Sequence, residues 1–255
     1  MRTITSVMVM NMAIATIVSL FCVRGVAEAL ASRSTANTNT IVTDIPPLVD
    51  VPVWSMATLN DDVGQGGEKS KATTNMNLLT YATPVSIRPN RLYALGLFKA
   101  TQSRDNFLRE KTCVLQLLSA NIEKHIECVR LLGGTSGKNV SKEEDLASMY
   151  GIELQELACD DGEETREDLP KVLPGCVQYM KLSMVGDEVT DYDGEESSHD
   201  VVICKVDKMW TASSLASNSR ERKSGNNNKD YLSTGRLREL GLITEQGRIA
   251  PLPEE

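Results

Sequence analysis

Short apolar runs rich in β-branched residues, each bounded by turn residues, recur along the chain from residue 77 onward. This pattern is typical of β-strands, whose side chains alternate between two faces. The predicted strands cover residues 77–87, 91–98, 113–118, 176–184 and 201–206, and residues 46–56 are expected to be extended. Because the strands do not alternate regularly with helices, the sequence favours a barrel over a doubly wound parallel sheet.

Four stretches have the spacing or the boundary residues of helices. In the longest, Ile122, Ile126 and Val129 fall near one helical face. Thr234 can cap a short helix that ends at Gly241. The predicted helices cover residues 103–109, 120–131, 142–149 and 235–240.

The N-terminal part of the chain has the composition of a targeting segment. Residues 4–23 are almost wholly apolar, Arg2 precedes them, and two A-x-A patterns follow within residues 27–31. We therefore predict a signal or targeting segment over residues 1–31 that is removed, leaving no stable membrane anchor. An uncleaved anchor is the alternative, because twenty apolar residues can span a bilayer.

The remaining organisation follows from changes in composition. Residues 32–45 are rich in Ser, Thr and Asn and form a transit-like or linker segment, and one domain is expected over residues 46–212. Within that domain, residues 60–74 and two acidic stretches are expected to be solvated loops. Residues 213–230 are polar and are expected to be a flexible loop. Residues 231–255 are expected to form a C-terminal helix and tail that packs on the barrel or on a dimer partner.

The charge balance argues against nucleic acid as a partner. The chain has 27 Lys and Arg against 35 Asp and Glu, a net charge of −8, and only 4% aromatic residues. Phosphate backbones need basic surfaces, and single strands need aromatic platforms. The six cysteines include no CxxC pair, which leaves neither a zinc ribbon nor a thioredoxin-type motif. The strand cysteines are expected to be reduced core residues.

The common catalytic motifs are absent from the sequence. There are two histidines, no HExxH and no GxSxG, so no metal site is predicted. The Gly133–Lys138 turn lacks the glycine spacing and the following hydroxyl residue of a P-loop. No GxGxxG exists, which removes the Rossmann route to a dinucleotide.

A series of stretches, in the right order over about residues 52–207, resembles the flavin reductase-like family of FMN-binding split barrels. The stretches are NMNLLTYATPVSI from Asn75, YALGLFKATQSRDNF from Tyr93, CVLQLL from Cys113, TSGKNVSK from Thr135, LPGC from Leu173 and HDVVI from His199. The resemblance implies a mainly β fold, a Greek-key split barrel with a few helices. It also implies an FMN-binding oxidoreductase that reduces flavin with NAD(P)H. An FMN-binding electron carrier or interaction module without NAD(P)H turnover is the alternative.

The resemblance assigns candidate cofactor contacts. Thr80, Tyr81, Ala82 and Thr83 would form the wall at the edge of the flavin ring, although β-strands favour Thr and Tyr in any case. Lys99, Thr101, Gln102 and Ser103 lie where a strand leads into a helix, whose N-terminus attracts phosphate. A simple capping role for Ser103 is the alternative there.

Ser136 and Lys138 would add phosphate contacts from the Gly-rich turn, unless that turn is a solvated loop. His199 is the one candidate catalytic residue: a neutral imidazole at the start of a strand could orient the nicotinamide or protonate reduced flavin. A surface histidine is the alternative for His199. The other histidine, His125, follows Lys124 in a predicted helix and is expected at the surface.

The resemblance also implies a homodimer with FMN near the two-fold interface. A sequon at Asn139–Ser141 would place a glycan on the turn that is expected to approach the phosphate. A flavin enzyme also needs a supply of FMN and reduced nicotinamide. We therefore expect entry into an organelle, a plastid first of all, with the secretory pathway or a membrane anchor as alternatives.

Overall fold

A computed structural model describes residues 49–60, 72–157, 169–187, 189, 197–211, 230–245 and 247–250. The chain divides into two compact units, and all described residues belong to the second, Leu48–Glu255. The predicted leader, the transit-like segment and nearly all of the predicted 213–230 loop lie outside the described residues. Among the described helices, none is long and apolar enough to cross a membrane.

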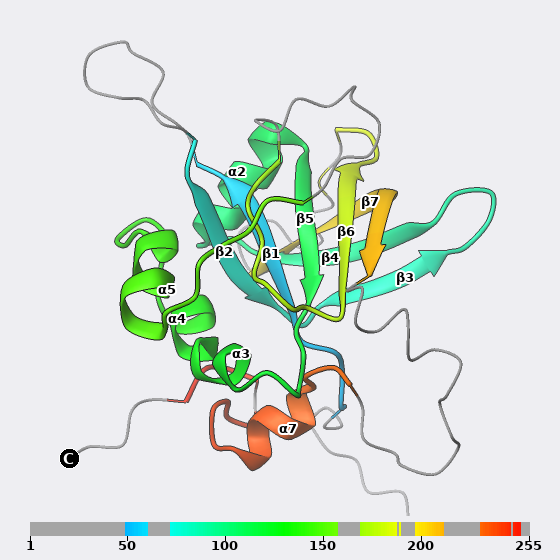
Figure 1. Cartoon of the computed structure of the whole chain (residues 1–255). Coiled ribbons are helices and arrows are strands. Elements are labelled where there is room, and N and C mark those ends of the chain that lie inside the picture. The colour runs from blue at the N-terminus through cyan, green and yellow to red at the C-terminus, as the bar shows by residue number, and fades with distance from the viewer. Residues whose placement is uncertain are drawn as a thin grey trace, which may run out of the picture. The chain divides into compact units, whose positions relative to one another are not determined.

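The described unit is built on one antiparallel sheet of seven strands (Figure 1). The strands are β1 Trp54–Leu59, β2 Thr74–Leu79, β3 Ala82–Ser86, β4 Leu92–Phe98, β5 Thr112–Leu117, β6 Gln178–Met184 and β7 His199–Thr211. Their order in the sheet, β2-β1-β5-β6-β7-β4-β3, departs from their order in the chain. This confirms the predicted mainly β class with a few helices.

The connection between β2 and β3 requires the sheet to curl. These strands form opposite edges of the sheet, yet only Thr80 and Tyr81 separate them in the chain. Six strand spacings in a flat sheet would place the edges about 28 Å apart. The three Cα steps from Leu79 to Ala82 reach at most about 11 Å. The two edges are therefore brought together at one point, which gives a barrel that is split along the rest of its length.

Side chains from the two faces of the sheet enter two separate hydrophobic cores. In β1, Met56 faces the barrel interior and Ala57 the outside, and in β5 Leu115 and Val114 do the same. Phe107 of the first described helix is fully buried in the interior core. The outer core lies between the sheet and the remaining helices, so β1 and β5 are covered on both faces.

The described helices are α2 Gln102–Glu110, α3 Glu123–Glu127, α4 Val129–Gly134, α5 Lys142–Tyr150 and α7 Thr234–Glu239. Helix α2 packs on β1, β2 and β5, whereas α4 and α5 pack on β2 (Figure 1). Strand β2 is therefore in contact with α2 and also with α4 and α5. This arrangement places the N-terminus of α2 close to the turn that follows α4.

Several predicted elements have different boundaries in the structure, among them the strand predicted over 201–206, which covers His199–Thr211 as β7. The predicted strand 77–87 is two strands, because the chain passes from one sheet edge to the other at residues 80–81. The predicted helix 120–131 is also two elements, α3 and α4, because Cys128 with a ψ of −2° interrupts it. The cap of α7 is Ser233, whose side chain accepts from the Arg236 amide, and Thr234 is the first helical residue.

The prediction that His125 lies at the surface is wrong. Its side chain is 1% exposed, with Nδ1 accepting from the Ser119 amide at 3.0 Å and Nε2 donating to the Pro174 carbonyl at 2.9 Å. These two bonds fit only the neutral tautomer that carries its proton on Nε2. Burial lowers the pKa of His125 accordingly. The charged neighbour Lys124 misled the prediction, because adjacent residues of a helix point to different faces.

Candidate functional site

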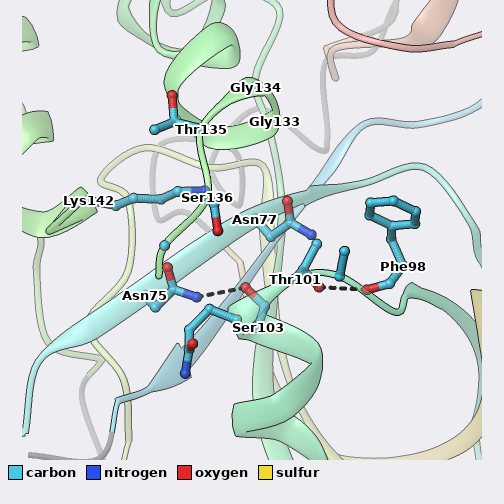
Figure 2. A pocket seen from close by; sticks show the side chains of 13 residues that line it. Asn75, Asn77, Phe98, Thr101, Ser103, Gly133, Gly134, Thr135, Ser136 and Lys142 are labelled. Carbon is cyan, nitrogen blue, oxygen red and sulfur yellow. Dashed lines mark hydrogen bonds between the residues drawn. The ribbon is translucent and has the colours of Figure 1, made fainter. Parts of the chain in front are cut away.

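A cavity of about 220 Å³ lies between β2, the start of α2 and the Gly-rich turn of residues 133–138, which begins with the last two residues of α4 (Figure 2). Its lining is mostly polar or glycine, and consists of Asn75, Asn77, Phe98, Ala100, Thr101, Gln102, Ser103, Gly133, Gly134, Thr135, Ser136, Gly137 and Lys142. Four of the predicted phosphate contacts, Thr101, Gln102, Ser103 and Ser136, are among them. The structure thus brings together two stretches that the sequence separates by more than thirty residues.

The first turn of α2 supplies backbone donors to this cavity. Thr101 is the N-cap, with an extended ψ of 142°, and its Oγ1 accepts from the Arg104 amide at 3.3 Å and donates to the Phe98 carbonyl at 2.9 Å. The amides of Gln102 and Ser103 have no acceptor within the helix, as in the first turn of any α-helix. The cavity therefore contains N–H groups at the positive end of a helix dipole.

The Gly-rich turn approaches β2 very closely. A β-carbon at Gly137 would lie 2.1 Å from Asn75 Oδ1, a distance that no side chain allows. The lack of a side chain at Gly137 lets the backbone of the turn form one wall of the cavity. Glycine here serves a close approach, the same physical reason for which phosphate-binding loops use it.

Asn75 joins β2 to α2 and carries an unused acceptor. It is 2% exposed, and its Nδ2 donates to Ser103 Oγ at 2.9 Å. Its Oδ1 is buried and has no hydrogen-bond partner among the residues described. A buried acceptor without a partner costs about 1–3 kcal/mol, and here the Gly-rich turn closes this oxygen off at Gly137.

Lys142 is a functional candidate that the sequence analysis missed. It is the first residue of α5, it is 3% exposed, and its Nζ donates to the carbonyls of Met76 at 2.7 Å and Leu132 at 2.8 Å. Figure 2 shows its side chain extending toward the Gly-rich turn. Burial lowers the pKa of Lys142 to about 8, with no carboxylate contributing. At pH 7 the group is therefore mostly an ammonium ion, with a third N–H beyond the two that are bonded.

The two predicted lysines lie outside the lining of this cavity. Lys99 Nζ is 3.9 Å from Asp200 Oδ1, and Lys138 Nζ is 2.9 Å from Asp105 Oδ2. Arg104 lies between the two acids, 2.6 Å from Asp200 and 3.1 Å from Asp105. These ion pairs form a charged rim near the start of α2, and the phosphate roles of Lys99 and Lys138 stay predictions.

Three aromatic side chains gather beside the cavity. The rings of Tyr81 and His199 are perpendicular with centroids 5.3 Å apart, and Phe98 lies 5.4 Å from His199. Tyr81 is 61% and Phe98 45% exposed, so these rings present an accessible aromatic surface. Phe98 also lines the cavity, which makes the surface continuous with it.

The other three residues predicted to line the edge of the flavin ring differ in their burial. Thr80 is half-buried, Thr83 is exposed, and Ala82 packs against the barrel interior. None of the three lines the cavity. Their contacts to a flavin ring stay predictions, and Tyr81 is the member of this group that the structure places next to His199.

The environment of His199 favours its neutral form. Its Nδ1 lies 2.8 Å from Ser198 Oγ. Partial burial lowers the pKa of His199, and the neighbouring Asp200 carboxylate opposes this shift without cancelling it. Near pH 7 the imidazole can therefore offer one donor and one acceptor nitrogen.

No family model matches the sequence, and no curated protein matches it. The chain is similar in structure to flavoredoxin from Methanosarcina acetivorans, with a TM-score of 0.49 and 10% identity over 69% of this chain and 76% of that one. It is similar to the FMN-binding protein from Thermus thermophilus, with a TM-score of 0.49 and 14% identity over 86% of this chain and 99% of that one. An NADH:FAD oxidoreductase from Streptomyces globisporus has a TM-score of 0.44 and 13% identity over 64% and 77% of the two chains.

Proposed function

We propose that this chain binds FMN and acts as an oxidoreductase of the flavin reductase type, with NAD(P)H as the reductant. One observation carries the proposal: a single small cavity combines the Lys142 ammonium, the N-terminus of α2 and a Gly-rich turn. A buried cation that bonds to carbonyls and to no carboxylate among the described residues, together with the backbone amides of a first helical turn, is a donor set that suits a phosphate.

The donors and acceptors of the cavity fit the polar half of FMN. Lys142, the amides of Gln102 and Ser103, and the Ser136 hydroxyl would hold the phosphate. At about 220 Å³ the cavity is smaller than the roughly 300–1,000 Å³ of pockets that enclose a whole drug-sized ligand. The flavin ring would therefore lie outside it.

The aromatic surface next to the cavity is suited to that ring. Tyr81 and Phe98 would contact its apolar face or edge and limit the access of water. Bound FMN supplies the hydride-accepting chemistry of the site. His199, neutral near pH 7, would orient the second ring or hold a proton at its unbonded nitrogen.

A second copy of the chain is the proposed partner of an apolar sheet face. Val85 of β3, Ile87 just after β3 and Phe98 of β4 are exposed. Ile203 of β7 is 36% exposed. Exposed apolar side chains clustered on one sheet are typical of an interaction surface. We propose that a homodimer covers them, with the aromatic surface at the edge of the interface.

The experiment is a fluorescence titration of FMN with the purified mature chain, followed by anaerobic addition of NADH or NADPH to the complex. Stoichiometric binding and bleaching of the flavin absorbance within seconds would support the enzyme. Binding without bleaching would favour the electron carrier or interaction module. Absence of FMN binding would refute the proposal altogether.

A further inference from the structure

The Gly-rich turn is packed against a residue near the C-terminus of the chain. A β-carbon at Gly133 would lie 2.9 Å from Ile249 Cδ1 and 2.7 Å from Leu78 Cδ1, and one at Gly134 would lie 3.3 Å from Ile249 Cγ2. Ile249 does not line the 220 Å³ cavity, so it contacts the turn from outside it. The two glycines are the positions at which this contact is possible.

A second cavity, of about 540 Å³, lies beside the same turn. Its lining is mixed apolar and polar, and consists of Arg130, Leu131, Gly134, Thr135, Met149, Tyr150, Ile249 and Ala250. Gly134 and Thr135 line both cavities. Because Gly134 and Thr135 face open space on two sides, the packing of Ile249 on Gly133 and Gly134 contributes to fixing the position of the backbone there.

Ile249 is itself held by a small hairpin. Ile243 and Ile249 form an antiparallel bridge, and the Ala250 amide donates to the Leu242 carbonyl at 2.9 Å. Arg130 Nη1 donates to the Ala250 carbonyl at 2.7 Å. Because Arg130 belongs to α4, the helix that ends in the turn, the hairpin is tied to the element whose end it supports.

We propose that Ile249 is a positioning residue for the phosphate of the flavin: it presses the Gly133–Gly134 backbone toward the cavity, so the C-terminal hairpin sets the affinity for phosphorylated flavin. This inference rests on the proposed function. Ile249 touches no ligand atom and acts through the turn. Its effect is therefore confined to the half of the ligand that the turn contacts, the phosphate.

The test compares FMN with riboflavin, which lacks the phosphate, in fluorescence titrations of wild type and Ile249→Ala. We expect the variant to raise the Kd for FMN by about tenfold through a faster dissociation rate, with the Kd for riboflavin unchanged. Ile249→Leu, which keeps the apolar volume, should retain wild-type FMN affinity. Ile249→Val, which removes only the Cδ1 atom that meets Gly133, gives a smaller effect in the same direction and serves if the alanine variant does not fold.

Leu232→Ala is the matched control, because Leu232 is a buried residue of the same outer core that lies outside the hairpin and bonds to Val53 and Leu118. It should lower the melting temperature and leave the ratio of FMN to riboflavin affinity at its wild-type value. Equal losses for both ligands in Ile249→Ala, or no loss in either, would overturn the inference while the proposed function stands. A wild-type chain that binds no FMN would overturn both.

Discussion

Gly137 lies against the carboxamide of Asn75, so that a β-carbon at position 137 would come within 2.1 Å of Asn75 Oδ1. The carboxamide cannot swing away freely, because its Nδ2 is bonded to Ser103 at the start of α2. The Asn75 side chain therefore links strand β2 to both helix α2 and the Gly-rich turn. Changes at either residue should affect the whole cavity.

We predict that Gly137→Ala displaces the turn and raises the Kd for FMN by at least about tenfold, with a loss of stability of roughly 1–3 kcal/mol from overpacking. Titration and urea unfolding measure the two effects. Gly186→Ala is the control, since Gly186 has a φ of 71° and no atom within 4 Å of its β-carbon position. It should cost stability through backbone strain and leave FMN affinity unchanged. Equal affinities for the two variants would contradict the assignment of the turn.

The FMN affinity should fall as the pH rises through about 8. The protonated Lys142 binds the phosphate, and its pKa of about 8 in the free protein means that the cation is lost above that pH. Titrations between pH 6.5 and 9.5 would measure this, and in Lys142→Met the decline should be absent and the affinity low throughout. Lys124→Met, an exposed lysine that donates to the Gly151 carbonyl, is the matched control and should behave as wild type. A pH profile that is the same in wild type and Lys142→Met would show that the phosphate binds elsewhere.

Acid should destabilise the protein through His125. Its pKa is lowered in the folded state, so the unfolded chain binds more protons below about pH 6.5, the ordinary histidine value. This contribution to stability is complete above that pH and is lost as the pH falls through it. Urea unfolding at pH 5.5 and 7.5 should show the loss, and His125→Gln should be less stable at both pH values with a smaller difference between them.

His199→Gln is the comparison for that measurement. His199 is only partly buried, so its replacement should leave most of the acid-dependent loss in place. If His199→Gln removed the pH dependence and His125→Gln kept it, the buried neutral histidine would not be its origin.

The proposed dimer gives a further prediction. Val85 of the edge strand β3 is 52% exposed, and Ile87, just after this strand, is 73% exposed. Ile87→Asp should produce a monomer, because a charge in an apolar interface is costly to desolvate. Light scattering at micromolar concentration measures the mass. Met149→Asp, at a 66% exposed position on α5, should leave the dimer intact. A wild-type chain with the mass of a monomer would contradict the proposed homodimer.

The sequence predicted the sheet better than it predicted the site. Strands such as β4 and β5 are short apolar runs bounded by polar residues, so local pattern was sufficient. The split at Thr80–Tyr81 was missed, because both halves have strand composition and only the sheet order reveals that they belong to opposite edges. Sequence-based boundaries are wrong where the pairing of strands that are distant in the chain decides where a strand ends.

The candidate site shows the same division. Thr101, Gln102 and Ser103 were predicted because a strand-to-helix junction is visible in the local sequence. Lys142 was not, because a lysine that opens a helix after a serine is ordinarily exposed, and its burial depends on carbonyls of Met76 and Leu132 from distant segments. The observation that singles it out is a buried ammonium whose bonds in the described part of the chain go to two backbone carbonyls, which only the structure can reveal.

The two-residue link between β2 and β3 has a consequence for engineering the chain. Since the opposite edges of the sheet meet through Thr80 and Tyr81 alone, the circumference of the barrel at that end is set by covalent connectivity. Extra glycines inserted between these residues would lengthen the tether without removing a ladder hydrogen bond of β2 or β3. Asn75 would stay with α2 while Tyr81 moved away with β3, so the length of the link would set the distance between the polar cavity and Tyr81.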